Sequence, residues 1–298
     1  MSPDGQRVFA SAILNSPTPD NLLGLGSLHY SNDYGLTFGP LSAFLGTGTP
    51  YTLWSSVALT PDYAYAAEYA YFNGATFEGG NVYRTGYSFV VTNNSTYIDY
   101  TNWTCLVTGT NRCPTPPANT GPVSTANFIS VAAAEKSGTV VACTTDSGGG
   151  GDIYVSTTNG VGLGLGKQNL QGPAGALRSW ASVSTSWFGS VIAAVDSATG
   201  YVWTAASPTP TQPLPATGIN WVRRDAAGAR KWSTVAVSAH GNRITAAVGW
   251  PLIPINGQPA TQKGFIYASA DYGATWSQRT SAGELSYRSV AMRADIGF

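Results

Sequence analysis

The chain has 298 residues, with 15 Lys plus Arg against 15 Asp plus Glu, so its net charge is near zero. Charged residues make up 10% of it, against about 25% in a typical soluble domain, and no basic face of the kind that binds nucleic acid is visible. No apolar run approaches the roughly 20 residues that span a bilayer. The 35 Gly, 18 Pro, 16 Tyr and 9 Trp favour short strands joined by tight turns. We therefore expect an all-β protein with no nucleic-acid partner and no membrane span.

The first predicted strands lie in residues 6–12 and 27–38. The second stretch, SLHYSNDYGLTF, places an Asp-Tyr-Gly turn between alternating residues, which is typical of a hairpin. A second copy, GFIYASADYGATW, occupies residues 264–276. In such a turn Asp accepts backbone N–H groups and Gly takes a positive φ, so both turns are predicted to be structural. Their shared pattern, Ser-x-Asp-x-Gly-x-Thr-(Trp or Phe), places these residues: Ser31, Asp33, Gly35, Ser269, Asp271, Gly273 and Trp276.

This pattern resembles the Asp-box of the sialidase-type BNR repeat family. The resemblance implies a β-propeller in which the boxes are turns at the blade periphery, away from the face that binds ligands. Sialidases of that family use three arginines for the substrate carboxylate, a Tyr paired with Glu, an acid–base Asp and an Arg-Ile-Pro motif. Here Arg7 is followed by Val8-Phe9 and arginines before residue 200 are few. The resemblance therefore implies the architecture and does not imply sialidase activity.

The segment that follows carries cysteines and glycosylation sequons. Cys105 and Cys113 flank a short loop and are predicted to form a disulfide, whereas Cys143 lies in an apolar strand and is expected to be a buried free thiol. Asn94 and Asn102 each begin an Asn-x-Ser/Thr sequon. Because disulfides form in oxidising compartments, this combination predicts a secreted or cell-surface protein.

A repeated motif, aromatic-x-(Ser/Thr)-Val-(Ala/Ser), organises the whole chain. Its aromatic residues lie 74, 52, 52 and 55 residues apart. Each motif is followed by a turn, an apolar strand, a strand with an aromatic residue, and a fourth strand, which is the pattern of a propeller blade. The five motifs begin at Trp54, Phe128, Trp180, Trp232 and Tyr287.

Counting the repeats predicts a single domain, a five-bladed β-propeller of four-stranded antiparallel blades. The predicted units span about 1–50, 51–125, 126–177, 178–229 and 230–284. The first unit lacks its first strand and a spare motif follows the fifth, so residues 285–298 are expected to close the ring against residues 6–12. The alternative is an excerpt of a longer repeat array. Met1 is followed by Ser-Pro-Asp-Gly rather than an apolar stretch, so a trimmed or domain-length fragment is expected.

Aromatic residues recur at one equivalent position on the third strand of each unit. A ring at such a position can pack between blades, or it can stack on the apolar face of a sugar, and repeated shallow sites would combine by avidity. Two loop tryptophans are alternative platforms. The candidate ligand-binding residues are Tyr83, Tyr154, Trp203 and Tyr267 on the third strands, and Trp187 and Trp250 in loops.

Catalytic residues are scarce in the sequence. His29 and His240 are the two histidines, which leaves almost no material for a Ser-His-Asp triad or a His-rich metal site. A glycosidase would need two carboxyl groups at a defined separation, and Glu68 and Glu135 are the acidic residues nearest to inner-strand positions. We expect no enzyme, no cofactor and no metal.

The function predicted from the sequence is a non-catalytic extracellular binding module that recognises glycans or takes part in adhesion. Its expected partners are glycans or extracellular and cell-surface proteins. The first alternative is a structural or protein-interaction propeller within a larger extracellular assembly. The second is a glycoside hydrolase.

Overall fold

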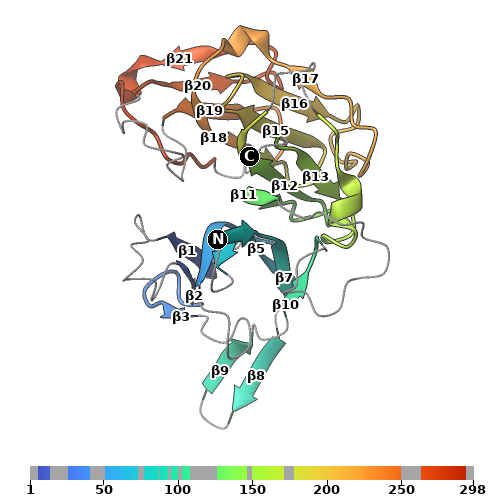
Figure 1. The fold of residues 1–298 in the computed structure, drawn as a ribbon, viewed down its shortest axis with the longest axis vertical. Helices are drawn as coiled ribbons and strands as arrows, with labels where there is room; N and C mark the ends of the chain where they lie inside the picture. The colour runs from blue at the N-terminus through green and yellow to red at the C-terminus, as the bar shows by residue number, and fades with distance from the viewer. Residues whose placement is uncertain are drawn as a thin grey trace, which may run out of the picture. The chain divides into compact units, whose positions relative to one another are not determined.

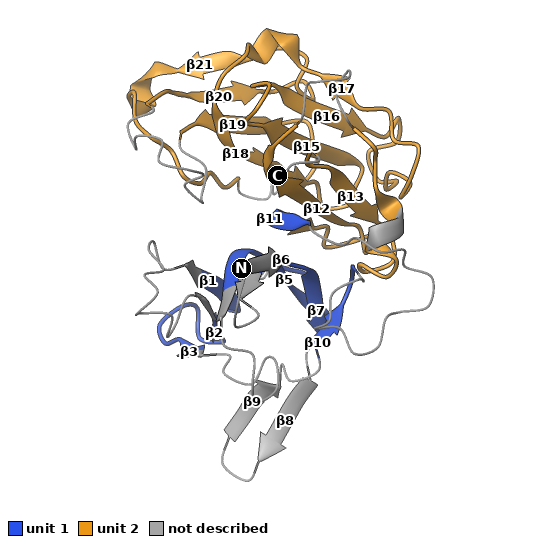
Figure 2. Cartoon of the chain, viewed as in Figure 1, with its two compact units in different colours: residues 1–131 blue, residues 132–298 orange. Residues whose placement is uncertain are grey.

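The computed structural model describes residues 6–13, 26–40, 51–72, 77–86, 88–92, 95–99, 103–107, 126–145, 150–170, 178–249 and 263–292. The chain divides into two compact units, residues 1–131 and residues 132–298 (Figure 2), and each is described by itself. Regular structure is almost entirely β-strand (Figure 1), with three short 3-10 helices among the described residues. None of the helices described is long and apolar enough to cross a membrane.

Unit 1 contains two antiparallel sheets and a separate hairpin. The first sheet has the order β1-β2-β3, and the second has the order β10-β7-β5-β4, with β6 paired to β5. Strands β8 and β9 form the hairpin, which the repeat pattern did not predict. The strands are β1 (Val8–Ile13), β2 (Gly26–Ser31), β3 (Gly39–Pro40), β4 (Tyr51–Leu59), β5 (Tyr63–Phe72), β6 (Phe77–Gly79), β7 (Val82–Gly86), β8 (Ser88–Thr92), β9 (Ser95–Asp99) and β10 (Trp103–Cys105).

Strand β11 (Asn127–Ala133) contains the division between the units and forms a three-stranded sheet with β12 and β13. Unit 2 continues with two four-stranded sheets, β14-β15-β16-β17 and β18-β19-β20-β21 (Figure 1). The elements are β12 (Val140–Thr145), β13 (Ile153–Ser156), η1 (Leu163–Gly166), β14 (Trp180–Thr185), β15 (Val191–Asp196), β16 (Val202–Ala206), β17 (Val222–Arg223), η2 (Asp225–Ala227), β18 (Trp232–Val237), β19 (Ile244–Val248), β20 (Ile266–Ser269), β21 (Ser277–Arg279) and η3 (Thr280–Ala282).

The repeated motif forms the first strand of its sheet, and its hydroxyl residue connects that strand to the next motif. The N–H of Val131 donates to Ser56 Oγ at 3.2 Å. The same bond recurs in unit 2, where Val235 N–H donates to Ser182 Oγ at 3.3 Å. A buried N–H without an acceptor would be costly, and in both places the motif hydroxyl supplies an acceptor for a backbone N–H of the following motif.

In three of the sheets the aromatic residue of the motif packs against the third-strand aromatic of the same sheet. Trp54 and Tyr83 are 5.6 Å apart between ring centroids and meet edge to face. Trp232 and Tyr267 meet in the same way at 5.2 Å, and such pairs contribute about 0.5–1.5 kcal/mol beyond their buried area. The strand register shifts at the motif aromatic in three of the sheets, which bends the first strand there.

The C-terminal motif packs on unit 2 without forming an assigned strand. Tyr287 O accepts a hydrogen bond from Ser233 Oγ at 2.7 Å, and Val290 N–H donates to Thr234 Oγ1 at 3.3 Å. Both contacts repeat those that β4 makes with the motif of β11. The five sheets follow the five predicted repeats, but the described part of the third repeat has three strands and a single bridge, Tyr154 to Lys167, in place of a fourth. The number of blades, the single domain and the ring closure stay predictions.

Candidate functional site

The two Asp-Tyr-Gly turns have the same hydrogen-bond network. In the second turn, Asp271 Oδ1 accepts from the N–H of Thr275 at 2.8 Å and Oδ2 accepts from its hydroxyl at 2.6 Å. Ser269 Oγ donates to Asp271 Oδ1 and accepts from Gly273 N–H. Hydrogen bonds to the hydroxyls and N–H groups of their own turns lower the pKa of Asp33 and of Asp271 to about 2. Both carboxylates therefore have a structural role, because they accept the hydrogen bonds that hold their own turns.

The tyrosines of these turns adopt an unexpected backbone conformation. Tyr34 and Tyr272 have φ of 62° and 59°, as well as the positive φ of the glycines that follow. Tyr272 N–H donates to Asn242 O at 3.1 Å, which ties the turn to its neighbour between β18 and β19. In the partial copy at residues 156–160, Asn159 and Gly160 also have positive φ, so the turn persists where Thr158 replaces the Asp.

Three of the six aromatic residues predicted to bind a ligand are buried. Tyr83, Tyr154 and Tyr267 are 1%, 3% and 7% exposed, because they pack within their own sheets. Trp203 remains partly exposed on β16, and Trp187 is partly exposed in the β14–β15 turn. Trp203 pairs with Ala194 near the end of β15, whereas Trp187 lies just before β15 begins, so these two rings lie at opposite ends of the sheet. Trp250 lies outside the described residues.

Several other predicted residues also fall outside the described part of the chain. Asn94 and Asn102, the sequon residues, and Cys113 lie there, while Cys105 ends β10, so the disulfide and the glycosylation stay predictions. Cys143 is a free, buried cysteine in β12. Glu68 is 1% exposed and accepts a hydrogen bond from Tyr83 OH at 2.8 Å.

A polar cluster occupies one end of the sheet β14–β17. The register pairs Trp180, the first residue of β14, with Asp196, the last residue of β15. Residues 197–201 then lead into β16, so the segment before β14 and the β15–β16 turn meet at this end. The Asp-Tyr-Gly turn of the next sheet lies at the other end, where β19 begins, because Ser269 pairs with Ile244.

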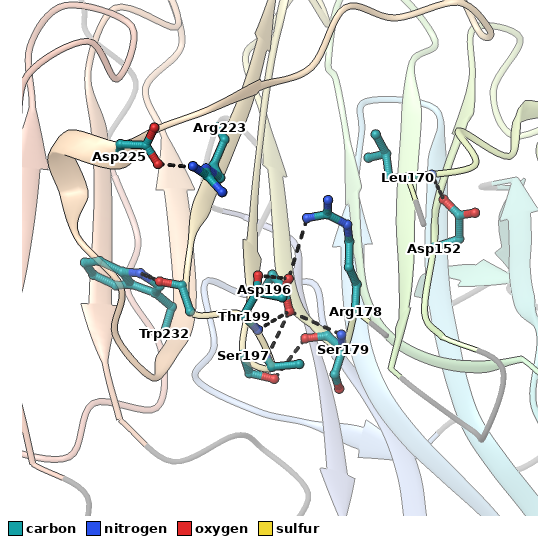
Figure 3. Close-up of polar contacts among 12 residues, drawn as sticks. Asp152, Leu170, Arg178, Ser179, Asp196, Ser197, Thr199, Arg223, Asp225 and Trp232 are labelled. Atoms are coloured by element: carbon teal, nitrogen blue, oxygen red, sulfur yellow. Dashed lines mark hydrogen bonds and ion pairs between the residues drawn. The ribbon is translucent and has the colours of Figure 1, made fainter. Parts of the chain in front are cut away.

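Asp196 connects the two segments of this end. Its Oδ1 accepts the N–H of Ser179 at 3.2 Å and that of Ala198 at 2.9 Å, and Oδ2 accepts the hydroxyl of Thr199 (Figure 3). Oδ2 also lies 3.7 Å from Nη1 of Arg178. Asp196 is fully buried and Arg178 is 9% exposed. A buried carboxylate needs this many partners because desolvation of an unpaired charge is costly.

The guanidinium of Arg178 contacts the carboxylate of Asp196 as well as two aromatic rings. Its guanidinium carbon lies 4.1 Å from the ring centroid of Trp203 and 5.8 Å from that of Trp180, within the range of a cation–π contact. Burial lowers the pKa of Arg178, and the charge of Asp196 opposes that shift. The arrangement is repeated in the next sheet, where Arg230 lies 4.4 Å from the ring of Tyr267.

Asp152 brings a second buried carboxyl group to this region. It precedes β13, is 2% exposed, and follows Gly151, whose N–H donates to Arg178 O at 2.6 Å. Its Oδ1 accepts from the N–H of Leu170 at 3.3 Å (Figure 3) and from that of Ile153 at 2.8 Å. Oδ2 lies 3.8 Å from Lys167 Nζ. Burial raises the pKa of Asp152, against the opposing effect of those backbone hydrogen bonds.

This region concentrates buried polar atoms that have no hydrogen-bond partner within the described part of the protein. Six such side-chain atoms occur among the described residues, and four of them belong to this cluster. They are the N–H groups Arg178 Nε, Trp180 Nε1 and Trp203 Nε1, and the oxygen Asp152 Oδ2. Native proteins satisfy nearly all buried polar groups, so a local excess of three donors and one acceptor is what a site for a polar ligand or ordered water presents.

The sequence analysis did not identify Asp152, Arg178 or Asp196 as site residues. One signal was available: an Arg-x-Trp pattern recurs at Arg178 and Arg230, two residues before a motif tryptophan. The spacing did not reveal that Arg178 folds over Trp203, which is 25 residues further along the chain. No three His, Cys, Asp or Glu side chains group as metal ligands would within the part of the chain that the structure describes.

No protein-family model matches the sequence, and no curated protein sequence matches it. Solved structures do match. The sialidase of Trypanosoma rangeli is similar over 96% of this chain and 49% of its own, at 14% identity and a TM-score of 0.54. Its complex with 2,3-difluorosialic acid, a covalent intermediate, is similar over 96% and 48%, at 13% identity and a TM-score of 0.53. The chain spans about half the length of these sialidases, and the similarity shows a propeller fold of the sialidase-like kind.

This similarity corrects the expectation that the chain is not an enzyme. The solved structures just described are enzymes of the same fold, so the fold gives no reason to exclude catalysis. The scarcity of histidine was the wrong criterion, because the chemistry of sialidase-type propellers, as the resemblance describes it, rests on Tyr, Glu, Asp and Arg.

Proposed function

We propose that the chain binds glycans at the cluster formed by Asp152, Arg178, Trp180, Asp196 and Trp203, which we call the Arg178 cluster. The observation that supports this most is the set of four unsatisfied polar atoms beside a partly exposed indole ring. A sugar presents hydroxyl groups that both donate and accept hydrogen bonds, together with an apolar face that stacks on aromatic rings. Ligand sites combine a few placed polar groups with aromatic surface in this way.

The test is a glycan array with the whole chain, followed by titration calorimetry on the glycans that bind. Trp203→Ala should lose binding at least tenfold, which corresponds to about 1.4 kcal/mol. The matched control is Arg230→Ala, which removes the equivalent Arg–aromatic contact from the next sheet and should leave glycan binding unchanged. An array without any bound glycan, from a chain that is folded by circular dichroism, would contradict the proposal and favour a protein partner.

A second candidate function is glycoside hydrolysis at the same cluster. A general acid needs a carboxyl group that is still protonated near neutral pH, and burial shifts the pKa of Asp152 in that direction. Asp196 is a second buried carboxyl group, held by Arg178. Release of reducing sugar from the glycans that bind, abolished in Asp152→Asn, would support hydrolysis, whereas binding without any released sugar would contradict it.

We also propose that the protein works outside the cell, alone or as part of a larger assembly. The support is the pair of sequons at Asn94 and Asn102 beside Cys105 and Cys113, in a chain with few charged residues. Expression through a secretory pathway should give a mass that falls on treatment with an N-glycosidase. A secreted chain of unmodified mass would contradict use of the sequons.

A further inference from the structure

We propose that the Arg178 cluster selects neutral glycans and discriminates against glycans that carry a carboxylate. This inference rests on the proposed glycan binding and names its ligand class. It concerns a property that the fold does not settle, because a propeller can present any set of side chains at the ends of its strands.

The first support is that three cations around the cluster each have an anionic partner. Arg178 pairs with Asp196 at 3.7 Å and Arg223 with Asp225 at 2.7 Å (Figure 3), and Lys167 pairs with Asp152 at 3.8 Å. The side chains of Lys167 and Arg223 are 40% and 47% exposed, so water and salt screen their remaining field. Lys231 also reaches this end, where its exposed ammonium donates to Ser197 O at 3.3 Å.

The second support is the nature of the atoms left for a ligand. Two of the three free donors are indole N–H groups, which can donate to a hydroxyl or ether oxygen and carry no net charge that would neutralise an anion. The third, Arg178 Nε, belongs to a guanidinium whose nearest carboxylate, Asp196, already lies within ion-pair distance. Tight recognition of a carboxylate instead uses a bidentate guanidinium that has no competing anion.

The third support is the free acceptor. Asp152 Oδ2 accepts no hydrogen bond within the described part of the protein and is buried. A sugar hydroxyl can donate to it, which would satisfy both groups. A ligand carboxylate cannot donate to it, and while Asp152 is ionised the two carboxylates would repel each other at this buried position. The oxygen therefore favours a hydroxyl and opposes an acid.

The experiment compares two pairs of ligands, each with a neutral and an acidic member. The first pair is lactose and sialyllactose, and the second is a hexose oligomer and its uronic-acid counterpart. Each is titrated into the whole chain at low and high salt. We expect the neutral member of a pair to bind at least tenfold more tightly, with less than a twofold change across the salt range. Asp152→Asn keeps the shape of the side chain and removes its charge, so it should narrow the neutral-to-acidic ratio. Asp225→Asn removes an exposed carboxylate from η2 and should change that ratio by less than twofold, because solvent screens the charge that it leaves on Arg223.

The outcomes separate the two proposals. Tighter binding of the acidic members, lost in Trp203→Ala, would overturn the neutral preference and leave glycan binding at the cluster in place. A neutral preference that Asp152→Asn does not alter would also overturn the inference, because its stated cause would be absent. If no member of any pair binds and the array is blank as well, the proposed function itself fails. Because Asp152→Asn and Asp225→Asn are nearly isosteric, the comparison does not depend on a truncation that could unfold the chain.

Discussion

The carboxylates of Asp33 and Asp271 each organise a turn whose backbone would otherwise be strained. Tyr34 and Tyr272 sit in the left-handed region, which disfavours residues other than Gly, Asn and Asp. Each turn offsets that strain with hydrogen bonds that converge on one Asp, including the N–H and hydroxyl of the same Thr. The residue-level consequence is that ionisation of the Asp and formation of the turn are coupled.

Asp271→Asn should therefore destabilise the protein at neutral pH and have less effect in acid. The pKa of Asp271 is about 2 in the folded protein, against about 3.9 for an unfolded Asp. A lowered pKa contributes stability that is fully present above pH 4 and is lost as pH falls through 2. Thermal unfolding of wild type and Asp271→Asn at pH 7, 4 and 2 should show midpoints that differ at pH 7 and converge by pH 2. A constant difference across the range would contradict this coupling.

Asp196 and Asp225 allow the stability contributed by a buried ion pair to be compared with that of an exposed one. Asp196→Ala removes the partner of a buried guanidinium and several acceptors for the β15–β16 turn, so it should cost about 3–5 kcal/mol. Asp225→Ala breaks an ion pair between exposed side chains and should cost less than about 1 kcal/mol. Urea unfolding measures both variants. Equal and small losses would mean that Arg178 finds another partner.

At the scale of elements, the motif strand and the motif that follows it are connected by side chains rather than by a shared ladder. Ser182 and Ser184 accept the N–H groups of Val235 and Val237. The same chemistry joins β18 to the C-terminal segment through Thr234. The hydroxyl groups of one motif therefore hydrogen-bond to the backbone of the next repeat, which lies beside it.

The C-terminal segment also depends on close backbone contact at Gly249. A Cβ added to Gly249 would lie 2.0 Å from Tyr287 O, far inside van der Waals contact, and Tyr287 is held by hydrogen bonds to Val248 O and from Ser233 Oγ. Gly249→Ala should displace residues 285–290 and raise their amide hydrogen exchange while β14–β17 stays protected. Gly86→Ala is the matched control for the added methyl group, because Gly86 has no positive φ and its Cβ would meet only Tyr63 Cε1, at 3.9 Å. Unchanged exchange at residues 285–290 would show that the backbone can shift without releasing the segment.

Prediction of the elements from the sequence succeeded where a period was repeated and failed where it was interrupted. The motifs at Trp54, Phe128, Trp180 and Trp232 each lie in a first strand, because alternation and spacing reinforce each other over several repeats. The hairpin β8–β9 has no counterpart in other repeats, so the period carried no information about it. The third-strand rings were assigned to ligands because spacing shows equivalence but does not show that the motif aromatic covers Tyr83 and Tyr267.

At the scale of the whole molecule, the candidate site shows what a single sequence cannot convey. Asp152, Arg178 and Trp203 come from a residue before β13, a residue before β14 and strand β16. They lie far apart in the chain and meet because successive sheets present the same ends of their strands. Their types were visible, but their juxtaposition depends on how one sheet packs against the next, and repeat spacing alone does not specify which side chains converge.

The oxidation state of the cysteines indicates the compartment in which the whole chain would work. Cys143 is fully buried in β12, so its thiol should react with iodoacetamide only after unfolding. If Cys105 and Cys113 form the predicted disulfide, unfolding without reductant should expose one reactive thiol, and unfolding with reductant should expose all three in the chain. Intact mass after alkylation counts them. Three reactive thiols without reductant, in protein made through an oxidising secretory pathway, would remove the disulfide and much of the argument for an extracellular setting. The glycan-binding proposal would be unaffected, because no atom of the Arg178 cluster belongs to a cysteine.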